Sequence, residues 1–196
     1  MEICLHTKLK NIATVQMGYS FRSRLEASGG GAIAVIQMKD LLGDNTVGCD
    51  DLVRIDLDAV KEHHLAQRGD LVFRSRGALT TAAVLLEDPG RAVVAAPLLR
   101  IRVKKPDKVL PEYLNWYISQ HDAQIFLTSR AKGTVQKMIS KQAIEDLEVV
   151  LPGLEKQKNI LDLASLLARE KKLLQQISDK REQYISSVLM HFAKGE

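Results

Sequence analysis

The sequence predicts an α+β fold, with a mixed, strand-rich globular domain over residues 1–150 and a long coiled-coil helix over residues 151–196. Short apolar runs separated by Gly, Asp and Asn fill the first part, and few stretches there have helical spacing. After Gly153 the chain has no Pro or Gly until Gly195, which is typical of one uninterrupted helix. Because short strands are mixed with few helices, we expect an α+β domain rather than a doubly wound parallel sheet.

Seven short apolar runs in the first part predict strands, at about 12–17, 33–38, 52–57, 70–75, 80–86, 92–96 and 98–103. Pro111 opens a predicted helix, because proline is tolerated in a first turn and Leu114 and Ile118 follow at helical spacing. Ser140 is expected to cap a short helix that runs through Leu147.

The C-terminal stretch from Leu154 to Phe192 predicts a single helix about 58 Å long. Its apolar residues follow a heptad frame that Glu170 and Arg181 interrupt. Such a stripe either folds back on its own domain or pairs with another helix, and the length favours pairing. The residues that we expect in the helix interface are Ile160, Leu163, Leu167, Leu174, Ile177, Tyr184 and Val188.

Composition restricts the class of protein more than it names a partner. Of 196 residues, 45% are hydrophobic and 27% charged, which is typical of a soluble globular chain. The net charge of +4 is too small to predict a nucleic-acid partner, and 5% aromatics argue against a base-stacking platform. Residues 40–90 carry 10 acidic and 5 basic groups, however, whereas residues 91–141 carry 10 basic and 3 acidic ones. A chain that separates charge in this way can present a basic face.

No catalytic motif is found. The chain has no phosphate-binding GxxxxGK[ST] loop, no GxGxxG, no GxSxG elbow and no CxxC pair. A nuclease site would have to join Asp107 to Glu170, which lies far away on the predicted long helix. We therefore expect a non-catalytic chain that needs no cofactor or metal. With no apolar run long enough for a signal peptide or a membrane span, we expect a cytoplasmic protein.

Three segments instead suggest DNA binding, namely residues 18–24, 73–77 and 129–137. Each places Arg or Lys beside hydroxyl or amide side chains, and each taken alone also fits an ordinary solvated loop. Arg bonds guanine and Gln bonds adenine in the major groove, while Lys, Ser and Thr contact phosphates. The residues that we expect to face DNA are Tyr19, Arg22, Arg24, Arg74, Arg76, Lys132, Thr134 and Gln136.

Four pieces of sequence, in order along almost the whole chain, resemble the DNA-specificity subunit of type I restriction-modification systems. KLKNIATVQMGYSF resembles the opening of its target-recognition domain, AIAVIQMKDL a strand that ends in Asp-Leu, and RGDLVFRSRG a Gly-Asp-apolar strand that ends at Arg-x-Gly. The most specific piece, residues 132–161, resembles a Gly-containing turn, a short helix, an apolar-Pro strand and the entry to the long helix. Leu154, Gln157 and Ile160 carry this last motif.

The resemblance implies a half-subunit, since the usual subunit has two target-recognition domains and two long helices paired antiparallel. It therefore implies a homodimer with antiparallel helices that reads a bipartite palindrome in double-stranded DNA. It also implies docking to DNA methyltransferase (modification) subunits, with restriction subunits as further partners, and leaves methyl transfer and cleavage to those subunits. The alternative is a coiled-coil interaction or regulatory protein of the same assembly that does not bind DNA itself.

Overall fold

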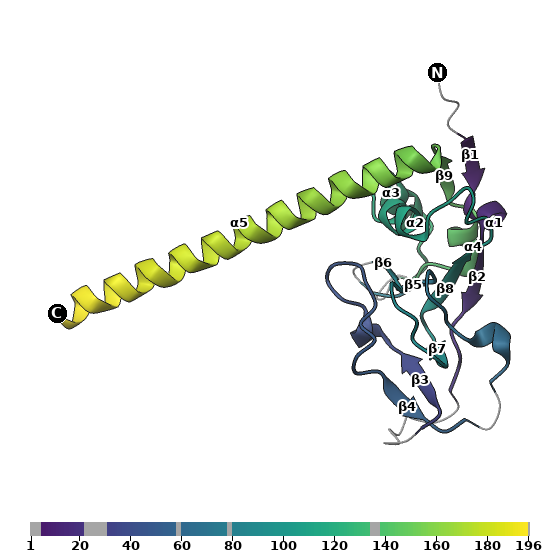
Figure 1. Ribbon diagram of the computed structural model, residues 1–196, viewed down its shortest axis with the longest axis horizontal. Coiled ribbons are helices and arrows are strands. Elements are labelled where there is room, and N and C mark those ends of the chain that lie inside the picture. Colours follow the sequence, from purple (N-terminus) through teal and green to yellow (C-terminus); the bar gives the residue numbers. More distant parts are fainter. Residues whose placement is uncertain (1–4, 22–30, 58–59, 78–79, 134–137, 196) are drawn as a thin grey trace. The chain divides into compact units, whose positions relative to one another are not determined.

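The computed structural model describes residues 5–21, 31–57, 60–77, 80–133 and 138–195 (Figure 1). The chain divides into two compact units, Met1–Gln157 and Lys158–Glu196. The strands are β1 (Leu5–Lys8), β2 (Ala13–Met17), β3 (Ile33–Ile36), β4 (Val53–Ile55), β5 (Leu71–Phe73), β6 (Ala82–Val84), β7 (Ala92–Val94), β8 (Leu99–Val103) and β9 (Glu148–Leu151). The helices are α1 (Leu9–Ile12), α2 (Pro111–Ile118), α3 (His121–Ser129), α4 (Lys141–Glu145) and α5 (Leu154–Lys194), with short 3-10 helices η1 (Met38–Asp40) and η2 (Glu62–His64).

The α+β class is confirmed, and each of the seven predicted runs contains a strand, β2 to β8, with tighter bounds. The apolar runs do not predict β1, because its LHTK sequence is mostly polar and exposed. It forms instead by pairing antiparallel with β9, Leu5 lying opposite Leu151. Only the family resemblance predicts β9. Pairing between such distant segments is a tertiary effect that a local pattern does not reveal.

The four-stranded sheet has the strand order β2-β8-β5-β6, and its register determines where the candidate site lies. Both β2 and β5 pair antiparallel with β8, and Met17 and Phe73 lie opposite the same residue, Leu99. The ends of β2 and β5 and the beginning of β8 therefore lie at one end of this sheet (Figure 1). A second sheet, ordered β4-β3-β7, pairs β3 antiparallel with β4 and parallel with β7.

The core lies on both faces of β3, all four residues of which are buried. Ala34 and Ile36 belong to one apolar cluster, and Ile33 and Val35 to a second. A strand covered on both faces reads as a continuous apolar run rather than as an alternation, which is why the sequence marks it clearly.

Two predicted helix starts are confirmed. Pro111 occupies the first turn of α2, which contacts β6. Ser140 caps α4, where its hydroxyl oxygen accepts a hydrogen bond from the Ala143 amide at 3.2 Å. No predicted element corresponds to α3, because its buried apolar residues are only Ala123 and Leu127 and its Ile125 is exposed.

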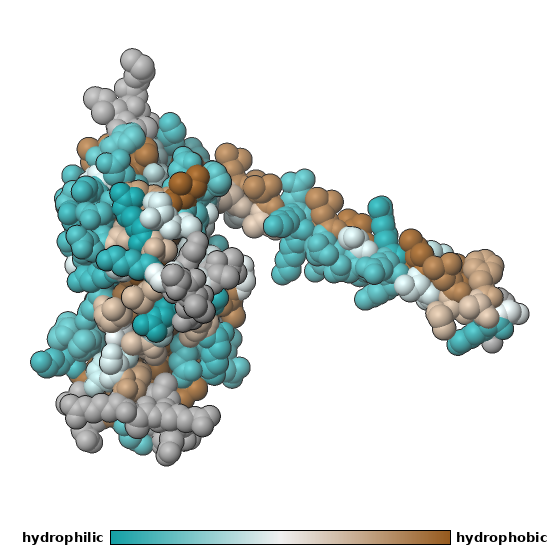
Figure 2. Space-filling model, turned by 180° about the vertical axis from the view of Figure 1, so that it is seen from behind, coloured by the Kyte–Doolittle hydropathy of each residue, from teal (hydrophilic) through white to brown (hydrophobic). Residues whose placement is uncertain are grey.

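The long helix is confirmed as α5, and its first turn is fixed by Gln157, a side chain with 0% exposure. The side-chain oxygen of Gln157 accepts from the Leu110 N–H at 3.0 Å. Its side-chain amino group donates to the backbone carbonyls of Lys108 and Pro152, both at 2.8 Å. Farther along, most side chains are exposed, and Figure 2 shows a hydrophobic band along the helix beside hydrophilic residues. Among the described residues, no helix is long and apolar enough to cross a membrane.

Candidate nucleic-acid interface

The first two predicted DNA-facing segments meet at one end of the four-stranded sheet. Gly18 follows β2, and its amide donates to the Leu98 carbonyl at 2.8 Å. Ser75 follows β5, and its hydroxyl donates to the Pro97 carbonyl just before β8. Residues 18–21 and 74–77 thus both contact the 95–98 turn, so that segments far apart in sequence share one surface.

The third segment lies against the second. The Ile139 amide donates to the Ser75 carbonyl at 2.8 Å, and Lys132 and Met138 exchange two backbone hydrogen bonds of 3.0 and 2.9 Å. The Arg76 guanidinium also donates to the Met138 sulfur at 3.2 Å. We define the loop cluster as residues 18–21, 74–77, 95–98, 132–133 and 138–139, excluding 78–79 and 134–137, which are outside the described residues.

The four predicted DNA-facing residues that the structure describes are not equivalent. Arg76 and Lys132 are exposed. Arg74 is half-buried and donates to the Met38 carbonyl at 3.3 Å, while its Nε is buried without a hydrogen-bond partner in the described part of the chain. The Tyr19 ring is half-buried and packs 5.0 Å from the Phe21 ring. The other predicted residues, Arg22, Arg24, Thr134 and Gln136, lie outside the described residues.

Gly18 is required by the close approach of the 95–98 turn. A Cβ atom at this position would lie 2.6 Å from the Ala95 carbonyl carbon, which is backbone and cannot rotate away. The next residue, Tyr19, donates its amide to the Val94 carbonyl and accepts from the Ala96 amide at 2.9 Å. The loop after β2 is therefore held by backbone pairing, with glycine permitting the contact.

An open hollow of about 450 Å³ lies within this surface, and it is lined by Ser20, Phe21, Gln37, Met38, Ala95, Ala96, Pro97 and Leu98. Its Gln37 side is fixed by Asp40, whose carboxylate accepts from the Gln37 amide at 2.7 Å. Burial raises the pKa of Asp40, while this hydrogen bond and the charge of Lys39 act in the opposite direction. The hollow joins an apolar wall to amide and hydroxyl groups, the mixture that reads base edges and methyl groups.

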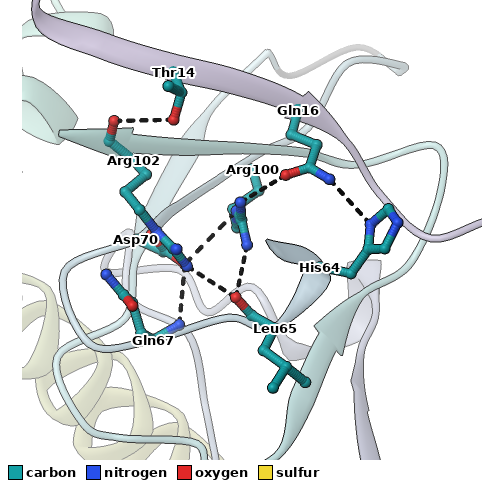
Figure 3. A network of polar contacts seen from close by, with 8 residues as sticks. All are labelled: Thr14, Gln16, His64, Leu65, Gln67, Asp70, Arg100 and Arg102. Atoms are coloured by element: carbon teal, nitrogen blue, oxygen red, sulfur yellow. Dashed lines mark hydrogen bonds and ion pairs between the residues drawn. The ribbon is translucent and has the colours of Figure 1, made fainter. Parts of the chain in front are cut away.

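A buried polar network joins the segment before β5 to β8 and to β2, the strand that leads into the loop cluster (Figure 3). The Asp70 carboxylate, with 0% exposure, accepts hydrogen bonds from Arg102 Nε at 2.6 Å and Nη2 at 2.7 Å. It also accepts from the backbone N–H of Gln67 at 3.0 Å. Arg100 Nε lies 3.8 Å from the same carboxylate. Both arginines also donate to the Leu65 carbonyl, at 2.6 and 2.8 Å. The network therefore fixes the segment between η2 and β5 onto β8.

The network continues to β2 through Gln16. Arg100 can only donate, so its 2.6 Å contact is to Gln16 Oε1, which directs the Gln16 amino group at His64 Nδ1, 3.0 Å away. His64 Nδ1 must then accept, which requires a neutral ring. Burial lowers the pKa of His64, and the charges of His63, Arg100 and Lys61 lower it further. Gln16 lies just before Gly18, so the network is tied to the strand that leads into the loop cluster.

These contacts change the interpretation of residues 91–141, whose excess of basic residues suggested a basic face. Arg100 and Arg102 belong to that block but are bound to Asp70 inside the domain, so the exposed basic charge is smaller than the count suggests. The site predicted from the sequence includes none of Asp70, Arg100, Arg102 and Gln16. Two signals were available, namely the Gly-Asp pair before the strand of residues 71–73 and the arginines alternating with apolar residues in LRIRV.

In the part of the chain that the structure describes, no three His, Cys, Asp or Glu side chains lie together as they would around a metal ion.

Solved structures of similar fold come from type I restriction-modification systems. One, from a study entitled structural basis underlying complex assembly and conformational transition of the type I R-M system, has a TM-score of 0.72 at 18% identity, over 94% of this chain and 43% of that one. The HsdS subunit from Thermoanaerobacter tengcongensis has a TM-score of 0.65 at 19% identity, over 88% and 39%. The S subunit from M. genitalium has 0.57 at 9%, over 86% and 40%.

The chain thus spans about two fifths of the length of these structures, and the likeness at such identities concerns the fold. No curated protein sequence matches the chain significantly. A family model does match, over residues 6–180, and its description is the type I restriction modification DNA specificity domain. The specificity component is non-catalytic, in agreement with the expectation from the missing motifs. The match covers most of the sequence, and the chain therefore belongs to the family of type I restriction modification DNA specificity domains.

Proposed function

We propose that this chain reads duplex DNA for a type I restriction-modification complex and leaves methyl transfer and cleavage to partner subunits. Residues 1–150 would form the reading domain, and residues 151–196 the helix for dimerisation and for docking modification subunits. Through that helix, two copies would pair antiparallel as a homodimer and present two identical domains to a bipartite palindrome. Restriction subunits would join through the modification subunits, and the complex would act in the cytoplasm.

The observation that carries the proposal is that the described parts of all three predicted segments meet in the loop cluster, two of them with basic side chains. Exposed Arg76 and Lys132 flank Met138, and Arg74 and Tyr19 lie at the same end of the sheet. The described residues of the reading site would thus be Tyr19, Arg74, Arg76 and Lys132. Arg22, Arg24, Thr134 and Gln136 remain part of the proposed site on sequence grounds.

Binding by the chain assembled with its modification subunits, measured on duplex DNA at several salt concentrations, tests this proposal. A steep loss of affinity with salt is expected, because lysine and arginine release counterions from phosphates. The double variant Arg76→Ala with Lys132→Ala is expected to lower affinity. Each lost phosphate contact reduces the salt slope by about one, and a lost base-reading arginine costs about 1–3 kcal/mol.

The matched control is Lys105→Ala with Lys108→Ala. It removes the same charge from exposed positions beyond the far end of β8, away from the loop cluster. Unchanged binding by the Arg76 and Lys132 variant, with loss in the control, would reject the loop cluster as the reading site. Salt-independent or absent binding by the assembled complex would instead favour the second candidate, a coiled-coil regulator without DNA binding. The exposed apolar band of α5 supports that candidate equally well.

A further inference from the structure

The core positions of α5 are symmetric about the point between Gln175 and Gln176. In the heptad frame that starts at Ile160, every a position has a d position at the same distance on the other side of this point. The pairs, from the centre outward, are Leu174 with Ile177, Glu170 with Arg181, Leu167 with Tyr184, Leu163 with Val188 and Ile160 with His191. Beside the frame, Leu166 mirrors Ile185 in the same way. In three of the five pairs an apolar residue (counting Tyr184) mirrors an apolar one, the two interrupting charges mirror each other, and in the outermost pair Ile160 mirrors the polar His191.

Most of these positions are exposed in the single chain, whereas Ile160 and Val188 are half-buried. Leu163, Leu174 and Ile177 are 68%, 59% and 48% exposed. Glu170 and Arg181 are exposed as well, and neither forms an ion pair within the described part of its own chain. A stripe of this length would leave its apolar surface in water unless another helix covers it.

We propose that α5 pairs antiparallel with α5 of a second copy, with a two-fold axis through the point between Gln175 and Gln176. Two-fold symmetry brings each residue opposite its mirror residue in the other chain. Glu170 of each copy then faces Arg181 of the other, twice per dimer. The inference rests on the proposed function in taking a second copy as the partner, whereas the register comes from the helix itself.

In other registers, Glu170 and Arg181 face apolar or like-charged residues of the second copy. Shifting the antiparallel pair by one heptad puts Glu170 opposite Leu174 or Val188, and Arg181 opposite Leu163 or Ile177. A parallel pair in register puts Glu170 opposite Glu170 and Arg181 opposite Arg181. Burying a charge against an apolar or like-charged residue is costly, so Glu170 and Arg181 select the register, as polar core residues do in coiled coils.

Charge reversal tests the inference in the full chain, with the dimer dissociation constant measured by analytical ultracentrifugation. Glu170→Arg and Arg181→Glu are each expected to raise it about tenfold or more, because each creates two like-charge contacts. Mixed in equal amounts, the two variants are expected to form a heterodimer close to wild-type affinity, since both cross-chain contacts become Arg with Glu. The control Lys172→Glu changes a charge on the outward face of the heptad frame and should leave the constant unchanged.

Cross-linking tests the direction of pairing. Two variants are made in a chain whose Cys4 and Cys49 are replaced by serine, one with Leu163→Cys and one with Val188→Cys. The two proteins are then mixed, and their cysteines are oxidised. A disulfide between the two chains is expected only in the mixture, because two copies of position 163 would lie about 37 Å apart at 1.5 Å per residue. Cross-linking of Leu163→Cys with itself would overturn the antiparallel register.

The outcomes separate this inference from the proposed function. A wild-type chain that stays monomeric at micromolar concentration would overturn the proposed homodimer, and the register with it. If the wild type dimerises, but mixing Glu170→Arg with Arg181→Glu does not lower the dissociation constant below that of each variant alone, the register is wrong. The proposed homodimer would still hold.

Discussion

The domain and the long helix use apolar residues in opposite ways. Within Met1–Gln157, Phe73, Leu99 and Ile101 are at most 1% exposed, and even a buried carboxylate has its partners. Within Lys158–Glu196, Leu167 and Tyr184 are 66% and 71% exposed. The first unit has a closed core of its own, whereas the second gains most of its stability from whatever covers it.

The largest effect is expected from Asp70→Ala in the domain. The substitution leaves Arg100 and Arg102 without their carboxylate partner in a site with little access to water. Removing one side of a buried ion pair typically costs about 3–5 kcal/mol, and we expect a loss of this size in the free energy of unfolding. Chemical denaturation monitored by circular dichroism measures it.

The control for this change is Asp56→Ala, which removes the same charge from an exposed position. It should alter the free energy of unfolding by no more than about 0.5 kcal/mol. An equally small effect of Asp70→Ala would mean that the network does not hold the domain together. A large effect would show that the network stabilises the domain that carries the loop cluster.

Asp70 also illustrates which features of the structure can be predicted from the sequence and which cannot. Continuous apolar runs predict β3 and β5, and uninterrupted helical spacing predicts α5, because these elements follow local rules. The arginine partners of Asp70 come from β8, at least thirty residues along the chain, and only the sheet register brings them together. The same holds for the site, since the sequence proposes three basic loops but does not say that they meet. Arg74 is one of the predicted DNA-facing residues, yet it is half-buried and donates to the Met38 carbonyl.

A pair of equal truncations compares the two units directly. Leu99→Ala removes a fully packed side chain from the domain and is expected to cost about 2–5 kcal/mol of unfolding free energy, at any protein concentration. Leu174→Ala makes the same change on α5, where the side chain is 59% exposed in the single chain. We expect it to weaken only association, so its effect should vanish upon dilution below the dimer dissociation constant.

Thermal unfolding of both variants over a hundredfold range of concentration measures this comparison. A concentration-independent loss of stability in Leu174→Ala would contradict it, because α5 would then be covered by its own chain. Concentration dependence in Leu99→Ala beyond that of the wild type would mean that the domain core also relies on a partner.

The smallest effect is expected from pH, through His64 in the domain. Burial holds the folded-state pKa of His64 below its ordinary value, which is about 6.5 in the unfolded chain. Below that pH the unfolded chain binds the proton more readily than the folded one, so stability falls as the pH drops from 7 through 6.5 toward the folded-state pKa. Above this window both states are neutral at His64, and its contribution is constant.

Unfolding free energies measured between pH 5 and 8 should therefore decline on the acid side in the wild type, and decline less in His64→Gln. The control His63→Gln removes the neighbouring imidazole, which contributes only part of the shift, and should retain most of the decline. Identical pH dependence in wild type and His64→Gln would mean that Gln16 does not require a neutral ring as its acceptor. Because α5 contains no residue of this network, the decline should also be the same at every protein concentration, unlike any effect that arises from helix pairing.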